Sequence, residues 1–494
     1  MKLQQLLSIA ESFTSSTLTV RTQAGPPVTK TYVELVADVR ELQKSLVALG
    51  LRAGHIVGLH AATTYEFVVW DLALLDMGIV SHVFPEGHSL SELNQAVEKH
   101  NLVCVVSQTT ESQVLPTAAV PDNVKVRLSP NLNGASSSNP DLLTLVYSSG
   151  TTGRTKGLKI SREGVESVAQ EFISSFEITA NDRHLIFLPL SHFQQRLSIY
   201  TCLFAGASLM LTPYTHLFQD LPRFAPTFLI GPPALYETLL GVLVPKGKES
   251  EGQRRLAAGL GGKIRFMITG MAPIRRGVLD AFTAHGMTLV EAYGITEVGL
   301  VAWNTPRDNQ VGTVGRPLRI HEVVLADDKE VIVHTRHALC MGYFESHEDD
   351  SRLTFLGDGR VATGDVGEFV DGRLMLKGRK KDIIVTSGGM KFHPGEVEDM
   401  LLTCPLIRQA VVLSDDRRKG IIAVLSVDDS GDAKAADDIA RCVESVNLTL
   451  DTHKRVERTV LTTTRFTVDN ELLTRTMKPN RHAISRYFLQ PGQA

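Results

Sequence analysis

The chain has 494 residues, of which 43% are hydrophobic and 21% are charged, and its formal net charge is −3. This length predicts at least two domains, and the composition is typical of globular proteins. The near-neutral charge gives no indication of a basic surface for nucleic acid, so no nucleic-acid partner is expected. The cysteines are scattered and form no CxxC pair, which indicates reduced thiols in a cytoplasmic protein and neither a disulfide framework nor a zinc site.

Apolar spacing predicts the elements of the first third of the chain. Residues 1–13 have the pattern of an amphipathic helix and lack the apolar core of a signal peptide. Helical spacing over 31–49 is followed by a buried strand at 55–61, and helical spacing over 64–78 is followed by a second strand at 102–108. This alternation predicts an α/β fold with layered, largely parallel sheets.

Two segments farther along the chain carry simpler signals. Residues 245–255 are rich in charge and are predicted to form an exposed loop. The apolar run at 197–211 is too short and too rich in Ser and Thr to span a bilayer. No transmembrane segment is therefore expected, and peripheral contact with a membrane stays open.

The composition shifts at 378–382, where the sequence reads GRKKD. Beyond it a separate βα pattern begins, with a helix from Pro394, strands at 410–414 and 420–428, and a helix at 434–450. We therefore predict a large N-terminal domain with several subdomains at 1–378, a hinge at 379–382, and a small, mobile α+β C-terminal domain at 383–494.

The stretch Tyr147–Ser161 reads YSSGTTGRTKGLKIS. It begins at the end of an apolar, β-prone segment at 142–149 and precedes a helix that Ser161 is expected to cap. Its glycines are too close together, and Lys156 is followed by Gly157, so the spacing excludes a Walker A loop. Glycines, hydroxyl groups and a lysine together favour a nest of donors, so we interpret the loop as a phosphate site and not as a linker.

This loop resembles the phosphate loop of the adenylate-forming superfamily, which contains acyl-CoA synthetases, firefly-type luciferases and the adenylation domains of peptide synthetases. One departure is Thr155, because the family usually has proline before the lysine. Further motifs of the family follow in the same order over most of the chain, namely LPLSHFQQR (188–196), ITGMAPI (268–274), EAYGITE (291–297), GRP (315–317), TGDVGE (363–368), GRKKDIIVTSGGMKFHPGEVE (378–398) and RTMKPNR (475–481). The resemblance implies a two-step reaction. A carboxylate attacks the α-phosphate of ATP to give an acyl-adenylate and pyrophosphate, and a thiol then displaces AMP.

The resemblance assigns the phosphates and the metal to two of these motifs. Glu297 is expected to bind Mg²⁺, which prefers carboxylate oxygen, and Thr296 is expected to donate a hydrogen bond to the α-phosphate. Thr151 and Lys156 are the expected direct contacts of the β- and γ-phosphates. The whole phosphate loop is expected to consist of Ser148, Ser149, Gly150, Thr151, Thr152, Gly153 and Lys156.

The nucleoside is assigned in the same way. Tyr293 is expected to stack on adenine, with Gly294 beside it in the same motif. Asp365 is expected to accept hydrogen bonds from both ribose hydroxyls, for which a carboxylate is well suited, and Arg379 to touch the same ribose.

Four further positions are assigned by the resemblance. Lys478 matches the catalytic lysine, which bridges the substrate carboxylate and the α-phosphate from the C-terminal domain. Lys381 matches the hinge residue about which that domain is expected to rotate after adenylation. Gly388 and Gly389 are expected to line the tunnel for a pantetheine thiol, since glycine lets a narrow chain pass close to the backbone. His192 matches a position beside the substrate carboxylate.

The substrate class is narrowed by the residues after the LPLSH motif. Amino-acid-activating members carry an aspartate there, and this chain has no acidic residue in that segment. The spacing of His192 and Arg196 resembles fatty acyl-CoA ligases instead, and an acyl pocket is expected from 193–240, 268–273 and 292–301.

We therefore expect an ATP- and Mg²⁺-dependent ligase that joins a small-molecule partner, a fatty or otherwise apolar carboxylic acid, to CoA. Three alternatives stay open. The enzyme could load the acid onto an acyl carrier protein, it could carry out a luciferase-like oxidation, or the chain could bind nucleotide without turnover.

Overall fold

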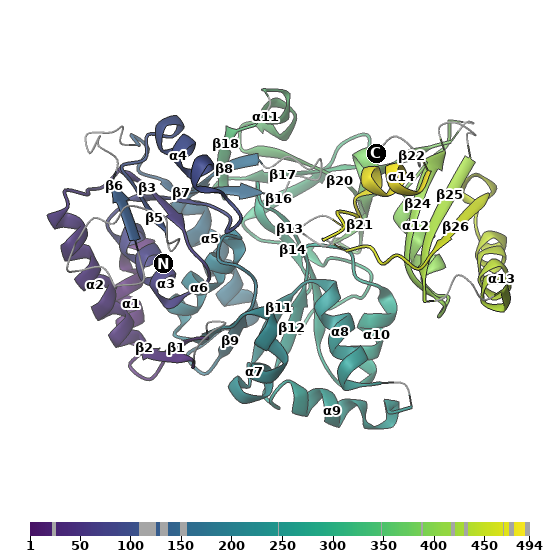
Figure 1. The fold of residues 1–494 in the computed structure, drawn as a ribbon, viewed down its shortest axis with the longest axis horizontal. Helices are drawn as coiled ribbons and strands as arrows, with labels where there is room; N and C mark the ends of the chain where they lie inside the picture. The colour runs from purple at the N-terminus through teal and green to yellow at the C-terminus, as the bar shows by residue number, and fades with distance from the viewer. Residues whose placement is uncertain are drawn as a thin grey trace.

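The computed structural model describes residues 1–21, 26–107, 125–128, 137–148, 156–245, 247–346, 348–386, 389–415, 420–428, 433–467, 469–473 and 479–489. In this part of the chain two large sheets and a smaller one precede the C-terminal sheets, and helices lie between and around them (Figure 1). We call the two large sheets A and B and the smaller one sheet C.

Sheet A has the order β15-β14-β13-β12-β11-β9-β10-β1-β2. The strands from β13 to β1 in this order are parallel to their neighbours, and β2, β14 and β15 are antiparallel additions at the two edges. The bounds are β1 Thr17–Val20, β2 Val28–Thr31, β9 Arg183–Ile186, β10 Ser208–Leu211, β11 Phe228–Gly231, β12 Phe266–Thr269, β13 Leu289–Ile295, β14 Gly299–Trp303 and β15 Arg316–Pro317. Parallel strands end at one edge of the sheet, and that edge is where ligands of such folds bind.

Sheet B has the order β18-β8-β7-β4-β3-β5-β6, with a parallel centre from β7 to β5. The bounds are β3 Ile56–His60, β4 Val80–Val83, β5 Cys104–Ser107, β6 Lys125–Leu128, β7 Leu142–Ser148, β8 Lys156–Ser161 and β18 Cys340–Glu345. Strands β7 and β8 form a hairpin in which Ser148 is paired with Lys156. The phosphate loop predicted from the sequence therefore joins two paired strands.

The helices form layers with the two large sheets. One core cluster joins the facing sides of sheets A and B through α1 (Leu6–Glu11), α2 (Tyr32–Ala48), α3 (Tyr65–Asp76), α5 (Arg162–Phe176) and α6 (Phe193–Ala205). A second cluster covers the other face of sheet A with α7 (Leu217–Phe224), α8 (Pro233–Leu243), α9 (Gly252–Gly259) and α10 (Arg276–Ala284). Helix α4 (Leu90–Lys99) packs on the outer face of sheet B. The predicted layered α/β architecture is confirmed.

Local capping explains where the long helices begin. Thr31 and Glu34 form a capping box at the start of α2, in which each side chain bonds to the backbone of the other residue. Thr64 accepts a hydrogen bond from the Phe67 amide at the start of α3. The Ser161 hydroxyl accepts one from the Gly164 amide at 2.9 Å, so Ser161 caps α5 as predicted.

Sheet C follows in the chain and packs against the β13–β14 hairpin. Its strands are β16 (His321–Leu325), β17 (Glu330–Thr335), β19 (Phe355–Gly357), β20 (Arg360–Val370) and β21 (Arg373–Arg379), and α11 (Glu348–Thr354) precedes β19. Val331, Val333 and Leu374 share one core cluster with Tyr293 and Val301. Sheet C is thereby fixed to the last strands of sheet A.

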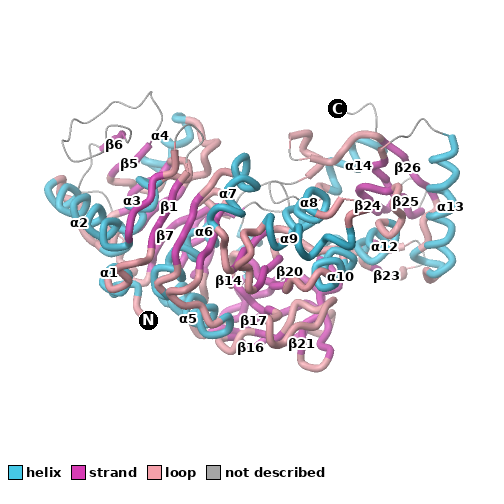
Figure 2. Tube along the Cα trace, turned by 90° about the horizontal axis from the view of Figure 1, so that it is seen from below, coloured by secondary structure: helices cyan, strands magenta, loops and turns pink. Residues whose placement is uncertain are grey.

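The C-terminal elements lie at one end of the molecule, opposite α1 and α2, in both views (Figures 1 and 2). They are β22 (Ile384–Val385), β23 (Lys391–Phe392), α12 (Pro394–Leu401), β24 (Ile407–Asp415), β25 (Gly420–Val427), α13 (Ala433–Thr449), β26 (Arg458–Thr462) and α14 (Arg481–Leu489). Two core clusters contain residues from Ile384 onward and none of the N-terminal elements described. This confirms a large N-terminal and a smaller C-terminal domain, whereas the domain boundaries, the hinge and the mobility stay predictions.

One expectation from the sequence is corrected by the structure. The charged segment 245–255 is not a continuous loop, because it contains a 3₁₀ helix at Glu249–Glu251 and the start of α9. Glu251 pairs there with Lys248 and Arg254 in neighbouring turns, at 3.4 and 2.9 Å. The cysteines are free thiols, and the sulfur atoms of Cys404 and Cys442 lie 2.6 Å apart.

The apolar run 197–211 is divided between helix α6 and strand β10. Among the helices that the structure describes, none combines the length and the apolar character that crossing a bilayer requires.

Candidate active site

The turn between β13 and β14 carries two of the predicted ligands, Thr296 and Glu297. The hairpin is tight at Gly294, which is paired with Leu300. A Cβ atom at Gly294 would lie 2.3 Å from the carbonyl oxygen of Gly299, so no other residue fits without moving the backbone. The close approach explains the glycine and fixes the hairpin that presents Thr296 and Glu297.

Lys156 and Glu297 meet at Tyr343 on β18. The Tyr343 hydroxyl donates a hydrogen bond to Oε1 of Glu297 at 2.7 Å. The Lys156 ammonium lies 4.9 Å from the centre of the Tyr343 ring and 3.4 Å from a carboxylate oxygen of Asp350. The end of the phosphate loop is thus brought beside the carboxylate predicted to hold the metal.

These residues fit a magnesium–nucleotide complex. Magnesium is commonly held by one or two carboxylates together with substrate phosphates and not by a cage of protein ligands. Glu297 is half-buried, and the described residues contain no cluster of three metal-ligating side chains that would form such a cage. The loop residues Ser149, Gly150, Thr151, Thr152 and Gly153 lie outside the described residues, so their contacts stay predictions.

Asp365 is the point where sheet C meets the β13 strand. It is paired across the β20–β21 ladder with Arg379, whose Nε lies 3.1 Å from Oδ1 of Asp365. The Tyr293 hydroxyl donates to Oδ2 at 2.6 Å. Burial, with the neighbouring Asp365 charge, raises the pKa of Tyr293, so the phenol stays a donor. Three of the residues predicted around the nucleoside, Tyr293, Asp365 and Arg379, are therefore joined through the Asp365 carboxylate.

Lys381 lies in a 3₁₀ helix, Lys380–Asp382, directly after β21. Its neighbour Lys380 is paired with Asp328 and Glu330 of sheet C at 2.6 and 2.7 Å. Desolvation, followed by the Arg379 charge, lowers the pKa of Lys381. The segment predicted to be the hinge is thus anchored on its N-terminal side.

The two residues predicted to line a thiol tunnel lie in the sequence between β22 and β23. Gly389 has φ of +76° and donates its amide to the Thr386 carbonyl at 2.9 Å. Gly388 lies outside the described residues. The tight turn suits glycine, and its contact with a thiol stays a prediction.

Lys478 also lies outside the described residues, but the chain on both sides of it is held. Leu473 forms a β-bridge with Pro479. The Arg481 guanidinium makes a bidentate pair with the largely buried Glu398, at 2.5 and 2.9 Å. The segment that contains Lys478 therefore begins and ends at fixed points of the C-terminal domain.

His192 and Arg196 do not form one site. His192 is exposed at the N-cap position of α6. Arg196 is fully buried, where it pairs with Asp71 and donates to Ser81 and Thr144 at 3.0 Å each. Of the two residues whose spacing resembles fatty acyl-CoA ligases, His192 therefore lies at the surface, whereas Arg196 joins α6 to α3 and sheet B.

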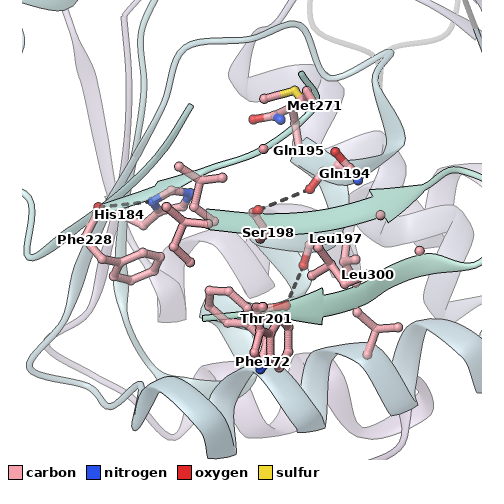
Figure 3. Close-up of a pocket in the computed structure, with 18 of the residues that line it drawn as sticks. Phe172, His184, Gln194, Gln195, Leu197, Ser198, Thr201, Phe228, Met271 and Leu300 are labelled. Carbon is pink, nitrogen blue, oxygen red and sulfur yellow. Dashed lines mark hydrogen bonds between the residues drawn. The ribbon is translucent and has the colours of Figure 1, made fainter. Parts of the chain in front are cut away.

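A pocket opens between sheet A and helices α5 and α6 (Figure 3). The empty space within it, including the solvent at its mouth, is about 960 Å³. The three segments expected from the sequence contribute to its lining. Val168, Phe172, His184 and Trp303 also line it and were not predicted, because a residue's spacing in the sequence does not show which side chains border a void. His192 is absent from the lining formed by the described residues.

The chain matches the models of two protein families. Residues 12–342 match the AMP-binding enzyme model, and residues 381–488 match the AMP-binding enzyme C-terminal domain. The chain belongs to the AMP-binding enzyme family. The predicted membership of the adenylate-forming superfamily is thereby confirmed.

Other proteins, some of them of known structure, are similar to this AMP-binding enzyme over nearly its whole chain. The long-chain-fatty-acid–CoA ligase FadD15 of Mycobacterium bovis is 26% identical over 94% of the chain and 92% of the relative. The long-chain-fatty-acid–[acyl-carrier-protein] ligase AEE15 of Arabidopsis thaliana is 22% identical over 97% of the chain and 84% of the relative. The o-succinylbenzoate CoA synthetase MenE of Bacillus subtilis, solved with its acyl-adenylate intermediate, superposes with a TM-score of 0.75 at 20% identity and 97% coverage of both chains. MenE has also been solved with ATP and magnesium ion, and these likenesses show the fold.

Alanine at Gly294 is expected to lower the activity of the AMP-binding enzyme by about 100-fold or more, because the added Cβ displaces the turn that carries Thr296 and Glu297. Acid-dependent release of pyrophosphate measures the loss. Gly277→Ala on α10 is the matched control, since a Cβ there meets no atom within 4 Å. Activity of Gly294→Ala equal to that of Gly277→Ala would contradict this account of the hairpin.

A pH dependence of stability is expected from Glu291 on β13. Burial raises its pKa to about 7, although the Gly312 amide donates to it at 3.2 Å. Between the ordinary pKa and about 7 the folded protein keeps a proton that the unfolded chain releases, so the free energy of unfolding falls as pH rises through this window. Glu291→Gln removes this dependence and is expected to be more stable than the parent at pH 8 by about 3 kcal/mol.

Urea unfolding of both proteins at a series of pH values measures this difference. The gap between them should close toward pH 5, where the parent carboxyl is also neutral. Glu322→Gln, at an exposed position of sheet C, should leave the pH dependence unchanged. A constant gap at all pH values would contradict the assignment to Glu291.

Proposed function

We propose that this AMP-binding enzyme activates an apolar carboxylic acid as its acyl-adenylate and then transfers the acyl group to the thiol of CoA. One observation carries the proposal. The lining of the pocket includes Gly294, which follows Tyr293 and precedes the turn of Thr296 and Glu297. A hydrocarbon chain in the pocket would therefore place its carboxylate beside the proposed nucleotide site.

The first step requires two anions to meet, so the main task of the protein is to neutralise charge and to align the attack. We assign the β- and γ-phosphates to the loop that ends at Lys156, and the ribose to Asp365 and Arg379. Thr296 donates to the α-phosphate, and Lys478 approaches it from the C-terminal domain. Magnesium, when bound at Glu297, supplies positive charge that stabilises the pyrophosphate leaving group.

The pair of Tyr293 and Arg379 has a further task in this scheme. Tyr293 contacts Oδ2 of Asp365 and Arg379 contacts Oδ1. These contacts hold the carboxylate in one orientation before the ribose binds. Fixed acceptors cost less ordering when they bind a ligand than mobile ones do. The adenine lies along Tyr293 and Gly294 in this proposal.

For the second step we propose that the C-terminal domain turns about Lys381, withdraws Lys478, and brings the turn of Gly388 and Gly389 to the site. A pantetheine thiol then attacks the acyl carbonyl and releases AMP. Either CoA or an acyl carrier protein presents such a thiol. Loading of a carrier protein is the second candidate function, because the relative AEE15 is named for that acceptor.

A pyrophosphate-release assay over fatty, aryl and dicarboxylic acids tests the proposal, with CoA or a phosphopantetheinylated carrier protein as acceptor. We expect release with the apolar acids and formation of the CoA thioester. Thioester formed on the carrier protein alone would favour the second candidate. Tight ATP binding without adenylate from any acid would contradict the proposal and favour a nucleotide-binding protein without turnover.

A further inference from the structure

Resting on the proposed function, we infer that the acid substrate carries a hydroxyl group on its hydrocarbon skeleton, and that His184 recognises this hydroxyl inside the pocket. His184 is a specificity-determining residue in this view. Its imidazole is one of the few ionisable groups in an otherwise largely apolar lining.

His184 lies on β9 with its side chain toward α5 and α6, and its residue is 1% exposed. The imidazole stacks on Phe228 with ring centres 4.4 Å apart and planes at 3°. Its Nδ1 lies 3.4 Å from the Phe228 carbonyl oxygen, and the other ring nitrogen faces the pocket (Figure 3). The ring is therefore held in one orientation, with one nitrogen available to a ligand.

The hydrogen bond and the burial together fix which nitrogen carries the proton. A carbonyl oxygen only accepts, so Nδ1 must be the donor in the contact with Phe228. Desolvation lowers the pKa of His184 to about 4, so the ring is neutral at physiological pH. Nε2 is then an acceptor, and among the described residues it has no hydrogen-bond partner.

The strand register places His184 deep in the pocket. Phe228 at the start of β11 is paired with both His184 and Phe266, whereas Gly231 at its end is paired with Thr269. The imidazole is therefore about 10 Å behind the edge at which the parallel strands end. A group that it contacts belongs to the chain of the acid and not to its carboxylate.

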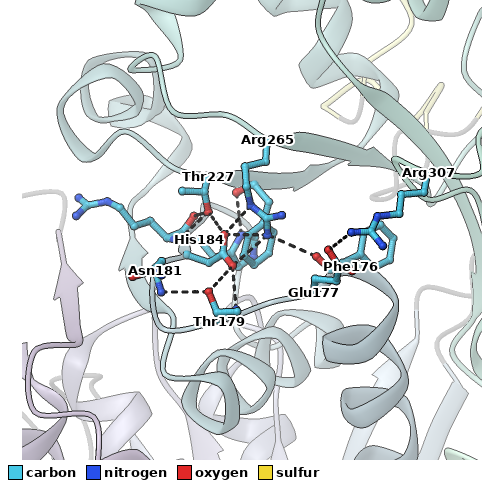
Figure 4. Close-up of polar contacts among 11 residues, drawn as sticks. Phe176, Glu177, Thr179, Asn181, His184, Thr227, Arg265 and Arg307 are labelled. Atoms are coloured by element: carbon cyan, nitrogen blue, oxygen red, sulfur yellow. Dashed lines mark hydrogen bonds and ion pairs between the residues drawn. The ribbon is translucent and has the colours of Figure 1, made fainter.

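A polar network centred on Asp182 holds the backbone around His184, and Figure 4 labels two of its members, Thr227 and Arg265. The Arg265 guanidinium contacts the Asp182 carboxylate at 2.9 and 3.0 Å, and the Thr227 hydroxyl donates to it at 2.6 Å. The Arg183 amide donates to the Thr227 hydroxyl at 2.9 Å. The starts of β9, β11 and β12 are thus tied together, so the position of the imidazole is fixed before a ligand enters.

The neighbouring polar groups of the pocket favour a donor in the ligand as well. The Ser198 hydroxyl donates to the Gln194 carbonyl at 3.1 Å, and the Thr201 hydroxyl donates to the Leu197 carbonyl at 2.7 Å. Their protons are used within α6, so both oxygens offer lone pairs to the interior. The amide groups of Gln194 and Gln195 lie one turn earlier on α6, where Figure 3 shows Gln195 beside Met271.

This arrangement predicts an order of preference among three kinds of acid substrate. A hydroxyl can donate to Nε2, a methylene leaves the nitrogen without a partner, and a ketone sets two acceptors against each other. At the matching carbon we therefore expect kcat/KM to fall in the order hydroxyl, methylene, ketone, with about tenfold between the first two. The carbon of the acid that carries the hydroxyl is found by testing each position along its hydrocarbon chain.

The test uses isomeric monohydroxy acids of one chain length, in which the hydroxyl is moved one carbon at a time, with the saturated and keto acids alongside. Pyrophosphate release measures kcat/KM for the parent protein, His184→Leu and Phe172→Leu. Phe172→Leu is the matched control, because it changes an apolar wall of the same pocket. The KM for ATP and the melting temperature of each variant report whether the fold is retained.

We expect one hydroxy isomer to be preferred by the parent and by Phe172→Leu, and His184→Leu to lose that preference while it still uses the saturated acid. A parent that uses the saturated or keto acids at least as well as every hydroxy isomer overturns the inference, and this result needs no variant. A preference that survives in His184→Leu overturns the assignment to His184. In both cases turnover of the saturated acid leaves the proposed ligase activity intact, whereas release from none of the acids contradicts the proposed function itself.

Discussion

Lys478→Ala is expected to lower acid-dependent exchange of labelled pyrophosphate into ATP by about 100- to 1,000-fold. A fixed cation at the α-phosphate stabilises charge that develops in the transition state, and removal of one such group costs rate of this size. The second step is expected to persist, because Lys478 is withdrawn from the site in the proposed cycle. Acyl-adenylate supplied with CoA should therefore still give thioester.

Two controls make this prediction specific. Arg486→Ala removes an exposed cation of the same terminal segment, on α14, and is expected to leave exchange unchanged. Lys478→Arg keeps the charge on a larger group and is expected to restore part of the activity. If exchange by Lys478→Ala were as fast as by the parent, the proposed role of Lys478 would be wrong.

Asp365→Ala is expected to raise the KM for ATP by about 100-fold. The change removes the acceptors proposed for the ribose hydroxyls, and hydrogen bonds to a charged group are among the stronger ones. It also leaves Arg379 and the Tyr293 hydroxyl without the carboxylate that they share. The melting temperature is expected to fall as well, because Arg379 loses the ion pair that it forms with the largely buried Asp365 carboxylate.

Steady-state kinetics with ATP and with a second nucleotide distinguish loss of ribose binding from general damage. ATP and its 2′,3′-dideoxy analogue carry the same phosphates and differ only in the ribose hydroxyls. The parent should therefore discriminate between them, and Asp365→Ala should not. Glu368→Ala is the matched control on the same strand, because Glu368 forms a comparable but exposed pair with Lys377 at 2.8 Å. Discrimination retained by Asp365→Ala would show that the ribose is bound elsewhere.

The sequence predicted those parts of the fold that depend on local patterns. The apolar spacing of α2 and α3 and the hydroxyl cap at Ser161 act within a few residues, so they could be predicted from the sequence. The strand before the predicted phosphate loop, β7, was likewise predicted from its apolar, β-prone sequence.

The contacts that build the site could not be predicted in this way. Tyr293 and Asp365 are 72 residues apart, and only the packing of sheet C on the β13–β14 hairpin brings them together. His184 is a single histidine in a short strand, and nothing in its neighbours shows that its ring stacks on Phe228. Cys404 and Cys442 show the same limit, since the turn after α12 and helix α13 bring together two thiols that are 38 residues apart.

The β20–β21 ladder places Arg379 opposite Asp365, and the chain leaves sheet C immediately afterwards at Lys380–Asp382. If the C-terminal domain pivots at this point, as proposed, the residues proposed to hold the ribose stay with the N-terminal domain. An activated mixed anhydride would then stay seated while the other lobe swings, which limits its escape and its wasteful hydrolysis by water. The number of ATP molecules that the enzyme spends per thioester would thus depend on the position of Arg379 at the end of β21.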